Sequence, residues 1–139
     1  MNYLYYPGCS LTASAREYDL ATRAVMTAAG VNLTEIDDWT CCGASAAAPI
    51  SHLLSLSLGA RNLALAEQTA AGGQVLVPCS ACYLNLKKAH EALRNNAASR
   101  TTINDALAAV NHNATGSVRV RHLLDMLAVD LGAAGLAPL

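Results

Sequence analysis

The chain has 139 residues, enough for one domain with a buried core and hardly enough for two. Hydrophobic residues make up 53% of it but aromatic residues only 4%, and much of the apolar content is alanine, which favours closely packed helices. A net charge of −1, with basic residues scattered along the chain, excludes the electrostatic footprint of a nucleic-acid-binding domain. No apolar run approaches the ~20 residues that cross a bilayer, so no transmembrane segment is expected.

The first part of the chain alternates strands with a helix. One strand is expected over 2–6, before a proline and a glycine, and another over 31–36. Between them the sequence predicts a helix over 14–29, with Ser14 as its N-cap and Gly30 at its end.

The rest of the chain continues the alternation. The expected elements are a helix over 53–71, a strand over 74–77, a helix over 80–95, a helix over 103–110, a strand over 118–120 and a helix over 122–131. Strands that alternate with helices predict an α/β fold, a small parallel sheet with flanking helices in a Rossmann-like arrangement. Residues 1–131 are expected to form a single domain, and residues 132–139 a tail or linker.

Five cysteines are the residues most suited to chemistry: Cys9, Cys41, Cys42, Cys79 and Cys82. Each cysteine group follows a predicted strand and precedes or begins a helix. Because ligands of parallel α/β folds bind beyond the carboxyl ends of the strands, these groups are expected to converge on one edge of the sheet.

The number and setting of the cysteines favour metal or redox use. The N-terminus lacks the basic start and apolar core of a signal peptide, so we expect a cytoplasmic protein, where structural disulfides are rare. A single C-x-x-C is a weak signal that zinc sites and redox dithiols share, whereas the vicinal pair before Gly43 is rarer. Five thiolates exceed the four that a cubane cluster or a zinc ion requires. Either one cysteine is free and reactive, or the metal centre is unusual.

Four segments, 5–9, 39–43, 78–86 and 118–124, resemble the CCG cysteine-rich domain found in the B-type subunit of heterodisulfide reductase and in its relatives. The resemblance implies a noncubane [4Fe–4S] cluster held by all five cysteines and used for electron transfer and disulfide or thiol redox chemistry. It also implies two partner chains, an iron–sulfur C-type subunit and a flavin A-type subunit, and a disulfide or thiol substrate.

The chain departs from a full B-type subunit in having one CCG motif where that subunit has two. It therefore resembles an N-terminal half, and complete reductase activity of the isolated chain is not expected. Two alternatives remain open at this point. One is a structural zinc or subunit-assembly domain, and the other is a metal-free dithiol oxidoreductase that uses Cys79 and Cys82. Among the histidines, His52 is the best candidate for a residue that supports the cysteine ligands.

Overall fold

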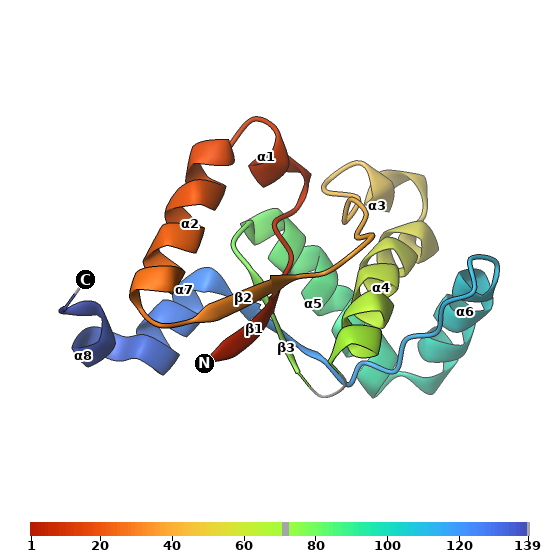
Figure 1. The fold of residues 1–139 in the computed structure, drawn as a ribbon. Coiled ribbons are helices and arrows are strands. Elements are labelled where there is room, and N and C mark those ends of the chain that lie inside the picture. The colour runs from red at the N-terminus through yellow and green to blue at the C-terminus, as the bar shows by residue number, and fades with distance from the viewer. Residues whose placement is uncertain (71–72, 139) are drawn as a thin grey trace.

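The computed structural model describes residues 1–70 and 73–138, and its centre is a four-stranded sheet in the order β2-β1-β3-β4 (Figure 1). All neighbouring strands are parallel, so the predicted α/β fold with a small parallel sheet is confirmed. The strands are β1 (Asn2–Tyr5), β2 (Asn32–Glu35), β3 (Gln74–Val77) and β4 (Arg119–His122).

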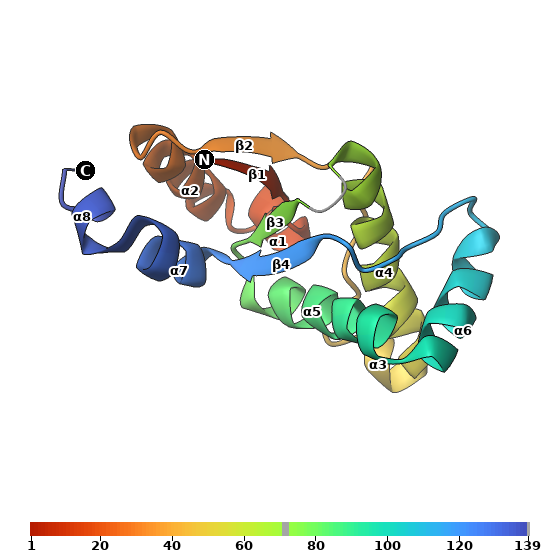
Figure 2. The same cartoon turned by 90° about the horizontal axis from the view of Figure 1, so that it is seen from below.

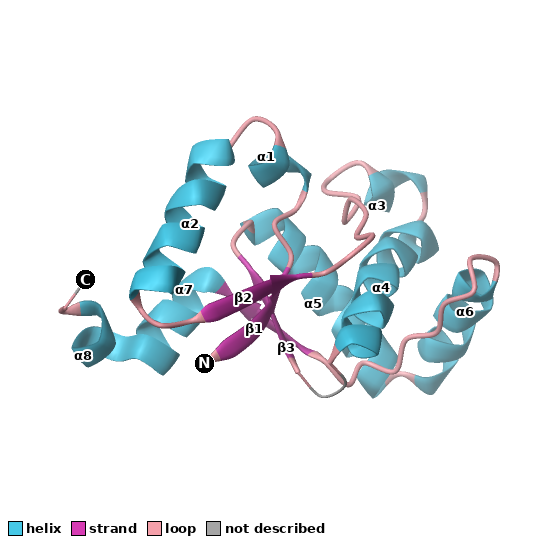
Figure 3. Cartoon of the chain, in the orientation of Figure 1, coloured by secondary structure: helices cyan, strands magenta, loops and turns pink. Residues whose placement is uncertain are grey.

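Helices connect the strands and account for most of the described residues (Figure 3). They are α1 (Cys9–Thr12), α2 (Arg16–Ala28), α3 (Ala47–Ile50), α4 (His52–Thr69), α5 (Ser80–Asn95), α6 (Ala97–Ala108), α7 (Leu123–Asp125), the π-helix η1 (Met126–Leu131) and α8 (Gly132–Leu136). Helix α2 and the α7–η1 segment cover one face of the sheet, and α4 and α5 cover the other (Figure 2).

The two faces of the sheet build two separate cores because successive strand side chains point to opposite sides. Tyr3 and Tyr5 of β1 pack with Met26 and Met126 on the α2 side. Leu4 belongs to the larger core on the other side, together with α4 and α5 side chains. Central strands covered on both faces read as continuous apolar runs, which explains the clear sequence signal of β3.

The strand order reverses between β1 and β3. The chain leaves β1 through α2 to reach β2 at one edge, and it leaves β3 through α5 to reach β4 at the other edge. The connections therefore diverge above the carboxyl ends of β1 and β3, and this is the position where an open parallel sheet offers a crevice for ligands.

The first expected helix differs from the structure at its start. The residues after β1 form the one-turn helix α1, and α2 begins only at Arg16 without a side-chain cap, so the predicted N-cap role of Ser14 is wrong. The predicted end is correct. Gly30 has a φ of 67° and its N–H donates to the carbonyl of Thr27 at 3.0 Å, as glycine commonly does after a helix.

The later helices also differ in extent. Helix α6 begins at Ala97, earlier than expected, because Asn96 caps it by accepting from the N–H of Ser99 at 2.9 Å. The expected terminal helix is divided into α7 and η1, and part of the expected tail forms α8. Ala71 and Gly72, at the predicted end of the helix over 53–71, lie outside the described residues, as does Leu139.

The loop before β4 is anchored by the carboxylate of Glu67. This carboxylate accepts hydrogen bonds of 2.7–3.0 Å from the N–H groups of residues 115–117 and from the hydroxyl of Thr115.

We expect Glu67→Gln to lower the free energy of unfolding by about 1–3 kcal/mol, because the amide NH₂ of the glutamine would then face backbone N–H groups and could not accept from them. Urea denaturation would measure this loss of stability. Glu91→Gln, which removes only a surface pair with Lys87 at 3.8 Å, should change stability by less than about 1 kcal/mol, and an equal loss in both variants would contradict the anchor.

Candidate metal centre

The three cysteine groups lie beyond the carboxyl ends of three strands. Cys9 begins α1 directly after β1, and Cys41 and Cys42 lie in the loop after β2. Cys79 follows β3 as the N-cap of α5, and Cys82 lies in the first turn of that helix. All three groups therefore open onto the same edge of the sheet, around the point where the strand order reverses.

The sulfurs form two contacts between different loops. The Cys9 and Cys41 sulfurs are 3.8 Å apart, and the Cys42 and Cys82 sulfurs are 3.3 Å apart. The structure thus brings together groups that are far apart in sequence. The first pair is exposed to solvent and the second pair is buried, while Cys79 is intermediate, so the site has an open side and a closed side.

The buried thiols differ in their affinity for a proton. Cys42 is 1% exposed, and its pKa is lowered to about 6, first by its hydrogen bond with Cys82 and then by bonds from the Ala44 N–H and the Asn85 amide. The pKa of Cys82 is raised above its usual range by that same contact, by burial and by Cys79. Of these two buried thiols, Cys42 is therefore the one that more readily becomes a thiolate, which is the form that binds metals.

Backbone N–H groups of the loop after β2 point at sulfur. Gly43 and Ala44 both have positive φ, of 87° and 42°. The N–H of Gly43 lies 3.4 Å from the Cys41 sulfur, and that of Ala44 lies 3.4 Å from the Cys42 sulfur. A side chain at Gly43 would meet the Ala47 methyl at 2.7 Å, so this turn requires glycine.

The turn after β1 brings backbone against the buried sulfurs. Gly8 has a φ of 77°, and a Cβ at this position would lie 2.8 Å from the Cys82 sulfur. Tyr6 is fully buried nearby and its hydroxyl donates to the Thr40 carbonyl at 2.7 Å. Burial and then the neighbouring cysteines, Cys82 foremost, raise the pKa of Tyr6 above its usual range, so the phenol stays neutral beside the thiols.

Two buried asparagines hold the cysteine loop. Asn62 of α4 and Asn85 of α5 both hydrogen bond to the segment from Thr40 to Ala44. Neither residue was predicted from the sequence. Asn85 carries a signal that could have found it, because it lies three residues after Cys82 on the same face of the helix. The candidate from sequence, His52, is instead exposed at the first residue of α4.

The five cysteine thiols suit a metal group that is bound by thiolates and is larger than a single ion. Five sulfurs from three segments lie at the same edge of the sheet. The N–H groups of Gly43 and Ala44 face two of them and can offset the negative charge of a thiolate. Within residues 1–70 and 73–138, however, no three cysteine, histidine or acidic side chains are placed to share one metal ion. Four of the five sulfurs touch in two pairs, and the Cys79 sulfur takes part in neither contact.

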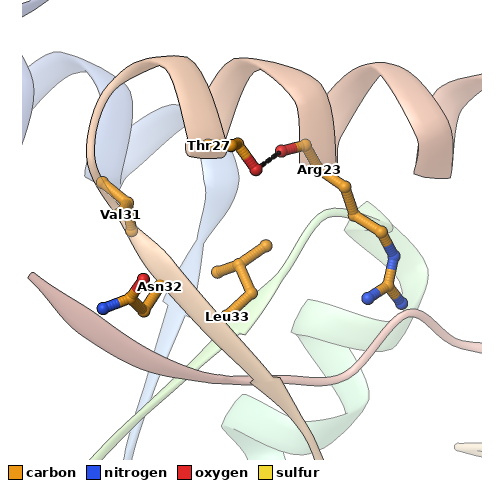
Figure 4. A pocket seen from close by; sticks show the side chains of 5 residues that line it. All are labelled: Arg23, Thr27, Val31, Asn32 and Leu33. Carbon is orange, nitrogen blue, oxygen red and sulfur yellow. Dashed lines mark hydrogen bonds between the residues drawn. The ribbon is translucent and has the colours of Figure 1, made fainter.

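A separate cavity of about 290 Å³ lies between α2 and the start of β2 (Figure 4). Its lining residues are Arg23, Thr27, Val31, Asn32 and Leu33, and the Thr27 hydroxyl donates to the Arg23 carbonyl at 2.8 Å. The lining includes no cysteine and contains the amino end of β2, whereas the cysteines lie beyond the carboxyl ends. This cavity is therefore not part of the candidate metal centre.

Fold and site together define a Rossmann-like α/β domain with a group of cysteines at its strand ends. The family model of the CCG cysteine-rich domain matches residues 3–87, more than half of the chain. The chain belongs to this family, as the motifs predicted.

Curated relatives are subunits of reductases. The chain is 40% identical over 129 residues to the 8-methylmenaquinol:fumarate reductase membrane anchor subunit of Wolinella succinogenes, covering 93% of this chain and 44% of that protein. It is 25% identical over 133 residues to a protein of Archaeoglobus profundus named as similar to the B-type subunit of heterodisulfide reductase, covering 95% of this chain and 44% of that one. For the B-type subunit of the ferredoxin/F(420)H(2)-dependent CoB-CoM heterodisulfide reductase of Methanosarcina acetivorans, the identity is 25% over 128 residues, with 91% and 42% covered. The chain thus spans less than half the length of these relatives.

A solved structure shares the fold. The crystal structure of a hypothetical protein from Helicobacter pylori superposes with a TM-score of 0.76 at 19% identity, covering 92% of this chain and 25% of that one. At this identity the match concerns the fold alone. Across the part of the chain that the structure describes, no helix has both the length and the apolar character needed to cross a membrane.

Proposed function

We propose that the chain binds a noncubane [4Fe–4S] cluster through Cys9, Cys41, Cys42, Cys79 and Cys82, as part of a reductase subunit. The observation that carries this proposal is the arrangement of the sulfurs. In a member of the CCG family, thiols from three loops reach one edge of the sheet and touch in pairs 3.8 and 3.3 Å apart. Iron–sulfur clusters are held by cysteine thiolates, which this site offers in excess of four.

The number of the sulfurs favours a cluster over a single zinc ion. A structural zinc site takes four ligands, whereas five cysteines reach this edge of the sheet, two of them as an exposed pair and two as a buried pair. A group with several metal atoms can reach both pairs at once. Zinc held by four of the five cysteines remains the alternative that experiment must exclude.

The surroundings of the sulfurs suit electron transfer. When bound, the cluster would supply single electrons to a disulfide or thiol substrate. Tyr6 is fully buried beside the cysteines and keeps the inner side of the site dry. The N–H groups of Gly43 and Ala44 face the Cys41 and Cys42 sulfurs. The exposed pair leaves one side of the site accessible to another molecule.

The relatives support a role within a larger complex. Two are named as B-type subunits of heterodisulfide reductase, or as similar to one, and the third is named as the membrane anchor subunit of a fumarate reductase. We propose that a second CCG domain, reached through residues 132–139, completes this chain, and that an iron–sulfur C-type and a flavin A-type subunit supply electrons. We place the domain in the cytoplasm, because free cysteines suit a reducing compartment.

Anaerobic reconstitution with iron and sulfide tests the cluster. We expect a brown protein with about four iron and four sulfide per chain, and loss of its visible absorption in Cys41→Ser and Cys42→Ser. Ser80→Ala, between two proposed ligands, is the matched control and should retain the cluster. A colourless protein with one zinc per chain would establish the zinc alternative. A metal-free mixed disulfide trapped at Cys79 or Cys82 would support a dithiol oxidoreductase.

A further inference from the structure

Asn85 is a buried polar residue beside Cys42. The residue is 8% exposed, and its side chain extends from α5 to the loop after β2. The Nδ2 group donates to the Ala44 carbonyl at 2.8 Å and contacts the carbonyl and the sulfur of Cys42 at 3.3 and 3.6 Å. Buried amides are almost always hydrogen bonded, and this one is bonded to a proposed ligand residue.

Asn62 is the comparison that separates two roles, holding the loop in place and donating to a cysteine sulfur. It is completely buried, and its amide pairs with both backbone groups of Thr40, at 2.8 and 2.9 Å. Both asparagines therefore fasten the same loop to a helix. Asn85 differs because its donor also reaches the Cys42 sulfur, whereas the hydrogen bonds of Asn62 go to backbone carbonyls and to a backbone N–H.

A hydrogen bond to a ligand sulfur stabilises the state of the cluster that carries more negative charge. The reduced state carries one more electron than the oxidised state, so such a bond raises the reduction potential. The effect is large where the site is buried, because water does not screen it. Cys42 is buried in this way, and its sulfur receives a second bond from the Ala44 N–H at 3.4 Å.

We propose that Asn85 is a positioning residue that orients the Cys42 sulfur and raises the reduction potential of the metal centre by donating to it. This inference rests on the proposed function, because it requires a cluster bound at Cys42. The inference assigns to Cys42 a role that the exposed Cys9 and Cys41 do not share. Among the hydrogen bonds of the described residues, the Cys42 sulfur is the only cysteine sulfur that a side-chain amide contacts.

Redox titration of the reconstituted chain tests the inference. Asn85→Leu removes the donor at similar size, and Asn85→Asp also adds negative charge, so the midpoint potential should fall in the order wild type, Leu, Asp. Asn62→Leu is the matched control. It should lower the melting temperature, as Asn85→Leu does, and leave the potential unchanged. Asn85→Ala replaces the leucine variant if that variant does not fold.

The outcomes separate the two claims. A wild-type chain that takes up no cluster overturns the proposed function, and this inference with it. A loaded Asn85→Leu chain with the wild-type potential overturns the inference and leaves cluster binding intact. Equal shifts in Asn85→Leu and Asn62→Leu would also overturn it, because the shift would then reflect displacement of the loop and not loss of the bond to sulfur.

Discussion

Gly8→Ala is expected to reduce cluster loading about tenfold while leaving the chain folded. The added methyl would lie 2.8 Å from the Cys82 sulfur, closer than van der Waals contact permits, and 3.5 Å from the Tyr6 ring. Either the sulfur or the turn after β1 must move, and either movement changes the position of a proposed ligand, Cys82 or Cys9. Overpacking of a buried site typically costs about 1–3 kcal/mol, a range that includes the 1.4 kcal/mol that corresponds to a tenfold change in binding. Iron and sulfide content after anaerobic reconstitution would measure the loss.

Gly30→Ala is the control for that experiment. Gly30 also has positive φ, 67° against 77° for Gly8, but Gly8 has a ψ of 161°, in a region that is essentially limited to glycine. A side chain at Gly30 meets nothing within 4 Å, since it follows α2 on the surface. Gly30→Ala should therefore lose less stability than Gly8→Ala, and it should load fully. Normal loading of Gly8→Ala would show that Cys82 does not need its present position.

Gly59→Leu is expected to lower the free energy of unfolding by about 3 kcal/mol. In an exposed helix, replacing glycine normally stabilises by about 1 kcal/mol, so the expected sign is reversed here. The reason is the close approach of α4 and α5. A Cβ at Gly59 would lie 2.9 Å from the Ala89 methyl and 3.1 Å from the Asn85 carbonyl, which is backbone and cannot rotate away. Urea denaturation monitored by circular dichroism would measure the change.

Gln68→Leu, an exposed position on the same helix, is the control for Gly59→Leu and should stay within about 0.5 kcal/mol of wild type. Since the same contact involves the backbone of Asn85, Gly59→Leu should also impair cluster loading. A stable Gly59→Leu chain would contradict the close packing of the two helices.

Local signals in the sequence predicted the strands and several helix bounds. Pro78 stops β3, and the helix expected over 80–95 has the bounds of α5. The failure at Ser14 has a tertiary cause, because the backbone after Gly8 turns into α1 against the cysteine site and leaves Ser14 between two helices. The early start of α6, by contrast, does have a local signal, because Asn96 is a favoured N-cap residue.

The positions of the cysteines at strand ends also followed from sequence, whereas their pairing did not. C-x-x-C and vicinal spacing would pair Cys79 with Cys82 and Cys41 with Cys42, yet the closest described contacts join Cys42 to Cys82 and Cys9 to Cys41. These contacts depend on how the first turn of α5 sits against the loops after β1 and β2. No local pattern encodes such distances between elements.

The pairing of the sulfurs also has a consequence for folding. A group bound to both pairs would hold residue 9 near residue 82 in the folded chain only. A ligand that binds only the folded chain stabilises that state by mass action. Uptake of the metal group and folding of the domain are therefore linked equilibria. A loaded molecule should resist unfolding, and an unfolded molecule should release what it holds.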